Sequence, residues 1–232
     1  MNDEVKTDMR ATLKLQLISL FSIPVVKTNI NRSFTKKEID CITSIPMKET
    51  KEEKTRKEKE GGTKEERKRG RGRQSESYEI LDKFAEELKD IKTFCEYELK
   101  RYLEDIEGVN TDITNLRITH AWLNKVKPQE CTDLHSHANS YLSGLLYIRC
   151  LPNDNIQFTN VYHRYWMQLP IKKATQSNTE GISVNIKEGD LILFPSWVPH
   201  QVGVNETENK ERVALSFDTW PTYLPSVYYP YK

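Results

Sequence analysis

Three histidines in the second half of the chain have the type and spacing of metal ligands. His135 and His137 are two positions apart, and His200 follows 63 residues later. Side chains two apart on an extended strand point to the same face, so His135 and His137 project together, as does Asp133. Two ligands from one strand end and one from a distant strand can form a facial triad, which leaves open positions on iron. A bare His-x-His pair is more often structural, so the prediction depends on the joint pattern.

The identity of the third ligand is open at this point. A strand rises about 3.3 Å per residue, so Asp133 and His137 lie roughly 13 Å apart along it. Both therefore cannot easily join His135 on one metal ion. The residues alone leave His137 and Asp133 as alternatives.

A buried cation is expected twelve residues after His200. Arg212 opens the apolar strand 212–218. A permanent positive charge in an apolar strand needs an anionic partner. A cosubstrate that carries a carboxylate would provide one.

The elements that must position these residues are short strands. From about Ile113 onward, β-branched and aromatic runs alternate with turn-rich segments, which favours an antiparallel sandwich or barrel. The predicted strands are Ile118–Leu123, Leu142–Cys150, Ile182–Ile186, Asp190–Phe194, His200–Val204 and Arg212–Trp220, with an earlier one at Phe21–Lys27. Apolar residues at steps of three and four from Ile80 to Ile106 predict one helix, with an N-cap at Ser75 or Ser77 and a stop at Gly108.

A charged segment interrupts the N-terminal part. From Lys48 to Arg73 there are twelve basic and seven acidic residues and no apolar side chain. Such a segment has no apolar surface whose burial could offset the conformational entropy that the chain loses on folding. We therefore predict a disordered insertion at about 47–75. Its basic end, 64–73, is the only stretch expected to contact nucleic acid. Charged runs of this kind are more often solvated tethers that bind no specific partner.

The three segments 134–150, 188–202 and 211–218, preceded by Trp122 and Asn124, resemble the 2-oxoglutarate- and Fe(II)-dependent oxygenases of the type frequent in phage genomes, relatives of the prolyl hydroxylases. The likeness is strong over about 110–220 and weaker over 21–26 and 74–81. It implies a mainly β fold, a double-stranded β-helix (jelly roll) with supporting outer helices. It also implies one domain over 15–232 after a tail at 1–14, with the barrel core at about 110–220.

The resemblance also implies roles for individual residues. His135 and His200 match two metal ligands, and His137 stands where most relatives have an acidic ligand, which favours a triad of His135, His137 and His200. Arg212 and Tyr147 match the residues that hold the far carboxylate of 2-oxoglutarate. The cofactors implied are Fe(II), 2-oxoglutarate and dioxygen, and the implied reaction is hydroxylation of a C–H bond, with a protein side chain favoured over a small molecule as the substrate.

A cupin barrel is the alternative. His-x-His, with Gly189, Pro195, His200 and Asn205, is similar to the two cupin motifs, although the expected acidic ligand is absent and Trp197 stands where glycine is usual. This reading predicts a non-catalytic metal-binding or interaction module with a basic tether. Arg212 and Tyr147 discriminate the two. His120 and His163 receive no role.

Composition excludes several classes of protein. Lys and Arg number 35 against 34 for Asp and Glu, so the net charge of +1 gives no general attraction to nucleic acid or anionic membranes. The longest apolar stretch, Leu15–Val26, is too short and polar to span a bilayer, and no secretory signal is expected. Four widely spaced cysteines indicate reduced thiols and a cytoplasmic location.

Overall fold

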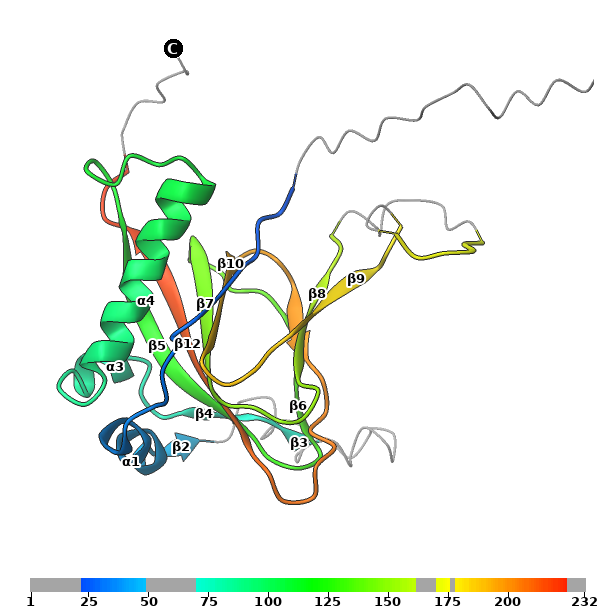
Figure 1. Ribbon diagram of the computed structural model, residues 1–232, viewed down its shortest axis with the longest axis horizontal. Helices are drawn as coiled ribbons and strands as arrows, with labels where there is room; N and C mark the ends of the chain where they lie inside the picture. Colours follow the sequence, from blue (N-terminus) through cyan, green and yellow to red (C-terminus); the bar gives the residue numbers. More distant parts are fainter. Residues whose placement is uncertain (1–21, 49–69, 162–169, 176–177, 225–232) are drawn as a thin grey trace, which may run out of the picture.

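Two β-sheets that face each other make up most of the structure (Figure 1). The computed structural model describes residues 22–48, 70–161, 170–175 and 178–224. Neighbouring strands are antiparallel except for the pair β3 and β6. In spatial order the large sheet contains β1 (Val26–Asn29), β10 (Asp190–Pro195), β7 (Leu142–Arg149), β12 (Arg212–Pro221), β5 (Leu116–Val126), β4 (Arg73–Ser75) and β2 (Met47–Lys48). The small sheet contains β3 (Gly70–Arg71), β6 (Glu130–His135), β11 (His200–Val202), β8 (Asn155–Thr159) and β9 (Gly181–Asn185).

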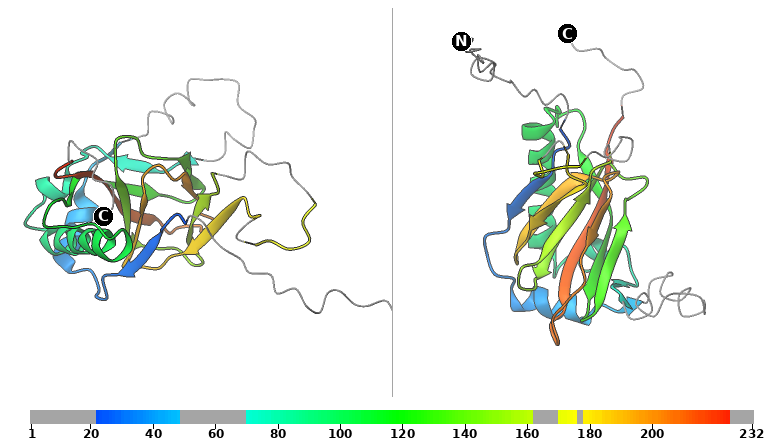
Figure 2. Two further views of the ribbon diagram at one scale, coloured as in Figure 1. Left: turned by 90° about the horizontal axis from the view of Figure 1, so that it is seen from above. Right: turned by 90° about the vertical axis from the view of Figure 1, so that its right-hand side faces the viewer.

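Helices cover the outer face of the large sheet. They are α1 (Lys36–Ser44), α3 (Ile80–Lys83) and α4 (Lys89–Arg101), which continues into the π-helical turn η2 (Tyr102–Ile106). Figure 1 shows α3 and α4 on the side of β5 and β12 that faces away from β6, β8 and β9, and Figure 2 shows the same layering from two further directions. None of the described helices is long and apolar enough to cross a membrane.

The central strands β7 and β10 of the large sheet are buried on both faces, which explains their continuous hydrophobic runs. On β7, Leu146 and Ile148 pack under the helices, whereas Leu145 and Tyr147 pack between the two sheets. β10 alternates in the same way, and Phe194 belongs to the inner set. Because the period is two, the position of Tyr147 in its strand decides that its side chain points into the barrel. The predicted jelly roll with outer helices is confirmed.

Most predicted strands are present with small shifts at their ends. The segment predicted at Phe21–Lys27 contributes β1, which begins at Val26 and pairs with β10 across the charged segment, as expected. The sequence analysis did not predict β8, because the residues around Asp154 are typical of a turn. It also did not predict α1, which begins with a capping box formed by Thr35 and Glu38.

The prediction of a single helix over 80–106 is wrong, because the segment is divided into α3 and α4. Residues 84–88 form turns that separate α3 from α4, and Ile80 in α3 and Ile91 in α4 are both fully buried. Packing of both segments on the same core overrides helix propensity here. Ser75 does not cap the helix, since it lies in β4 and its hydroxyl accepts a hydrogen bond from the amide of Leu123 at 3.1 Å. Gly108, with φ of +65°, follows the helical segment as predicted.

The predicted insertion is too wide at both ends. Residues 47–48 form β2 and residues 73–75 form β4, and these two strands pair with each other through Met47 and Ser75. Residues 70–71 form β3, so part of the basic run 64–73 is a strand. The interior, 49–69, lies outside the described residues, and disorder there stays a prediction. The two strand ends return the chain to the edge of the large sheet.

Candidate metal centre

Strand pairing brings the first two histidines together. β11 lies between β6 and β8 in the small sheet, and its register places His200 directly opposite His135. On the other side His200 is opposite Phe158. The ring centroids of His135 and His200 are 4.4 Å apart. A separation of 65 residues in the sequence therefore becomes a cross-strand pair.

His137 joins this pair from just beyond the end of β6. Its backbone amide donates to the carbonyl oxygen of Ser196 at 2.9 Å, which ties the chain after β6 to the end of β10. Its ring centroid lies 5.2 Å from that of His135 and 5.1 Å from that of His200. One ring nitrogen from each of the three residues lies within 4.8 Å of the other two, which is a suitable arrangement for a metal ion.

The hydrogen bonds of the three rings select one tautomer. Nδ1 of His135 lies 2.8 Å from the backbone oxygen of Asp133, and Nδ1 of His200 lies 3.1 Å from that of Val198. Nδ1 of His137 lies 2.7 Å from Oδ1 of Asp218. Backbone carbonyls and ionised carboxylates only accept hydrogen bonds, so each neutral ring carries its proton on Nδ1. The lone pair of each ring is then on Nε2, as a metal ligand requires.

Burial keeps His200 in the form that binds metals. The side chain is buried, and Phe194 packs against it with the ring centroids 4.6 Å apart. Burial first, and then the nearby His135, lower the pKa of His200 to about 3. His200 is therefore neutral at physiological pH. His135 is the most exposed of the three, so the cluster opens to solvent on its side.

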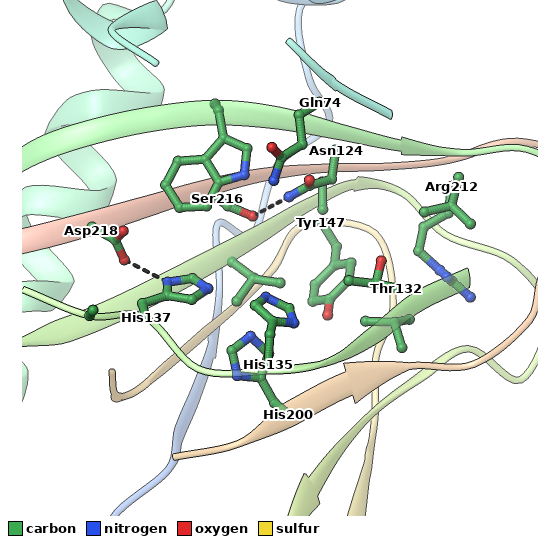
Figure 3. A pocket seen from close by; sticks show the side chains of 16 residues that line it. Gln74, Asn124, Thr132, His135, His137, Tyr147, His200, Arg212, Ser216 and Asp218 are labelled. Carbon is green, nitrogen blue, oxygen red and sulfur yellow. Dashed lines mark hydrogen bonds and ion pairs between the residues drawn. The ribbon is translucent and has the colours of Figure 1, made fainter. Parts of the chain in front are cut away.

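A cavity of about 270 Å³ extends from the histidine cluster into the barrel, and Figure 3 shows the side chains that line it. β12 contributes one wall with every second residue, because residues two apart share a face. Arg212 lies at one end of this wall, Ser216 follows, and Asp218 lies at the other end beside His137. The cavity therefore has a guanidinium end and a histidine end.

Arg212 has an anionic partner within the chain. Its Nε donates to Oδ2 of Asp154 at 2.6 Å, and its Nη2 donates to Oδ1 of the same carboxylate. The side chains are 5% and 2% exposed, so the pair is desolvated. The sequence predicted that Arg212 needs an anionic partner and suggested the carboxylate of a cosubstrate, and in the structure Asp154 supplies that counter-charge. Nη1, which lies 3.4 Å from the carbonyl oxygen of Gly203, is not bonded to that carboxylate.

Two polar atoms along the cavity have no hydrogen-bond partner among the described residues. They are the hydroxyl of Tyr147 and the indole nitrogen of Trp122, and both are buried. Burial raises the pKa of Tyr147 well above its usual range, so the hydroxyl stays protonated and can donate. A buried donor without a partner costs free energy, which a ligand with an acceptor oxygen would recover.

The remaining sequence predictions can now be placed. Asp133 does not belong to the group of potential metal ligands formed by His135, His137 and His200. Its carboxylate lies 3.5 Å from Sγ of Cys131. His120 is exposed on β5, and its ring contacts the hydroxyl of Thr119. His163 lies outside the described residues. The sequence analysis missed Asp154 and Asp218. Asp218 could have been found, because it is six residues after Arg212 on the same predicted strand and its side chain therefore lies on the same face.

The fold and the site together define a class of protein: a jelly-roll barrel with a cluster of three histidines at the mouth of an internal cavity. Residues 120–218 match the family described as "Putative 2OG-Fe(II) oxygenase". This segment contains the three histidines, Tyr147 and Arg212. The predicted resemblance to 2-oxoglutarate- and Fe(II)-dependent oxygenases is confirmed, while the narrower likeness to prolyl hydroxylases stays a prediction.

Solved structures support the same fold. The α-ketoglutarate-dependent carbocyclase SnoK from nogalamycin biosynthesis has a TM-score of 0.51 and 13% identity, with 85% of this chain and 79% of SnoK covered. The epimerase SnoN from the same biosynthesis has a TM-score of 0.52 and 11% identity, with 88% and 82% covered. SnoN in complex with Fe³⁺, α-ketoglutarate and nogalamycin RO gives a TM-score of 0.50. The comparison with curated proteins found no match.

Proposed function

We propose that this protein is an Fe(II)- and 2-oxoglutarate-dependent oxygenase that hydroxylates a C–H bond of its substrate. The observation that carries the proposal is the cluster of His135, His137 and His200, whose hydrogen bonds leave all three lone pairs on Nε2. Imidazole suits iron, and three ligands on one face leave positions open. Bound iron supplies the activation of dioxygen that couples decarboxylation of 2-oxoglutarate to oxidation of the substrate.

The far end of the cavity supports binding of the cosubstrate. The hydroxyl of Tyr147 is a buried donor that finds no partner within the described part of the chain, and Nη1 of Arg212 is not engaged by Asp154. These two groups are the proposed donors to the far carboxylate of 2-oxoglutarate, with Thr132 beside them in the cavity wall. Because Asp154 balances the charge of Arg212, we expect hydrogen bonds to contribute more to affinity than net charge does.

A protein side chain is the proposed substrate. Trp197, three positions before His200 between β10 and β11, is 51% exposed. Exposed apolar side chains beside a site favour contact with an apolar part of a partner. A peptide that inserts one aliphatic side chain toward the metal would suit this rim.

A second candidate is a metal-binding module without 2-oxoglutarate, as the cupin alternative predicts. The ion pair between Arg212 and Asp154 favours it, because the guanidinium has a counter-charge without any cosubstrate. This candidate retains the histidine cluster and requires no donor for a second carboxylate. Tyr147 argues against it, since its hydroxyl has no partner among the described residues.

One experiment separates the two candidates. 2-Oxoglutarate is titrated calorimetrically into the purified protein under anaerobic conditions, with and without Fe(II), and His200→Ala serves as the metal-deficient control. The oxygenase predicts binding of one 2-oxoglutarate per chain that requires Fe(II), followed by succinate formation when oxygen is admitted. Tight Fe(II) binding without any binding of 2-oxoglutarate would refute the oxygenase and leave the metal-binding module.

A further inference from the structure

Asp218 is the charged side chain that contacts the ring of His137. It lies on β12, and its Oδ1 is 2.7 Å from Nδ1 of His137 (Figure 3). The hydroxyl of Ser143 lies 2.8 Å from the same carboxylate oxygen and 2.8 Å from the same ring nitrogen. The side chains of His137 and Asp218 are 10% and 16% exposed, so water competes little for this hydrogen bond.

The local backbone aims Asp218 at this position. The pairing of β12 with β5 is regular up to Asp218 and His120, and a bulge follows between Asp218 and Thr219. A bulge redirects the side chains of a strand and is frequent beside functional sites. The hydroxyl of Ser143 also lies 2.8 Å from that of Ser196, which extends the polar contacts around the carboxylate. The carboxylate of Asp218 is therefore held by the hydroxyl of Ser143 on β7 and by the ring of His137.

The three histidines differ in what accepts their Nδ1 proton. His135 and His200 donate to backbone carbonyl oxygens, which are neutral. Nδ1 of His137 donates to a carboxylate, that of Asp218. A carboxylate that accepts from a metal-bound imidazole fixes the tautomer and the ring orientation and makes the ring a stronger ligand.

The hydrogen bond between His137 and Asp218 affects the net charge around the proposed metal ion. Three neutral imidazoles bring no charge to a divalent metal, whereas two imidazoles and one carboxylate bring one negative charge. His137 occupies the position two residues after His135, and Asp218 lies one hydrogen bond further from the cluster centre. The negative charge is thus present in the site, although it is not on a ligand.

We propose that Asp218 is a positioning residue for the metal centre: it holds His137 with Nε2 toward the metal and supplies, through the ring, the negative charge that the three histidines lack. This inference rests on the proposed function, because it requires that the cluster binds Fe(II). It adds a residue from β12 to a site whose ligands come from the chain around β6 and β11.

The test is the affinity for Fe(II) measured by anaerobic titration of the full chain, with Asp218→Asn as the variant. Asparagine keeps the size of the side chain but removes the charge, and its amide group can donate to Nδ1 and so favour the wrong tautomer. We expect the dissociation constant for Fe(II) to rise about 10–100-fold. The matched control is Asp133→Asn, which removes the same charge two residues from His135 and should change the affinity much less, because it keeps the backbone oxygen that lies 2.8 Å from Nδ1 of His135.

The outcomes separate this inference from the proposed function. If the unchanged protein binds Fe(II) and Asp218→Asn binds it equally well, the role of Asp218 is refuted while the metal site stands. A loss as complete as in His200→Ala would make Asp218 a ligand and would also refute the positioning role. Failure of the unchanged protein to bind Fe(II) would refute the proposed function itself.

A second measurement does not depend on the folding of any variant. The ¹⁵N chemical shifts of the histidine rings report which nitrogen carries the proton in the metal-free protein at neutral pH. We expect His137 to be protonated at Nδ1, with a lone pair on Nε2. A His137 ring with its only proton on Nε2 would overturn the inference.

Discussion

The buried ion pair between Arg212 and Asp154 gives a prediction whose size follows from its geometry. Arg212→Met removes the guanidinium and leaves the carboxylate of Asp154, which is 2% exposed, without its counter-charge. Breaking a buried pair in this way costs about 3–5 kcal/mol. For a domain of this size each kcal/mol shifts the melting temperature by about 2–4 °C, so we expect Tm to fall by roughly 6–20 °C.

The assay is thermal unfolding followed by circular dichroism. Arg149→Met is the matched control, because Arg149 is half exposed and its nitrogen lies 4.0 Å from the carboxylate of Glu211. An exposed pair of this kind contributes about 0–1 kcal/mol, so the control should melt within a few degrees of the unchanged protein. The double variant Arg212→Met/Asp154→Asn should recover part of the loss, since it leaves no buried charge. The reasoning is refuted if Arg212→Met melts at the temperature of the Arg149→Met control.

Three further predictions concern the cavity, the core and the insertion. Tyr147→Phe removes a hydroxyl that has no hydrogen-bond partner in the described ranges, so Tm should not fall. Affinity for 2-oxoglutarate should weaken by about 1.5–3 kcal/mol, the value of a hydrogen bond to a charged group, and unchanged affinity in calorimetry would remove Tyr147 from the site. Gly144→Ala places a methyl group against the ring of Phe217 and should cost about 1–3 kcal/mol in urea unfolding, and a cost near zero would contradict this packing. Replacement of 49–69 by a shorter Gly/Ser linker should leave Tm essentially unchanged, and a large drop would show that this segment packs.

The barrel and the histidine cluster were predictable because both depend on strand periodicity. Short apolar and aromatic runs between turn-rich segments identify β7, β10 and β12, and the spacing of His135 and His137 places two rings on one side of the chain. The residues already suggested that His200 joins this pair, but the exact pairing of β6 with β11 brings together residues 65 positions apart. Register between distant strands is set by packing and not by local sequence.

The acidic residues around the site could not be predicted in the same way. Asp154 lies in a segment whose composition reads as a turn, and its contact with Arg212 requires that β12 passes close to that segment. Asp218 is on the same face of β12 as Arg212, which the sequence shows, but its contact with His137 also requires that the chain after β6 lies beside that face. Contacts between residues 58 or 81 positions apart depend on the assembled barrel, so no local pattern encodes them.

The central claim is that His135, His137 and His200 bind one Fe(II). The most direct test is anaerobic titration of Fe(II) into the unchanged protein and into four variants, with bound metal counted per chain. The account predicts one Fe(II) per chain in the unchanged protein, loss of tight binding in His135→Ala and His200→Ala, strong weakening in His137→Ala and little change in Asp133→Ala. Retention of the metal in His137→Ala together with its loss in Asp133→Ala would contradict the three-histidine centre.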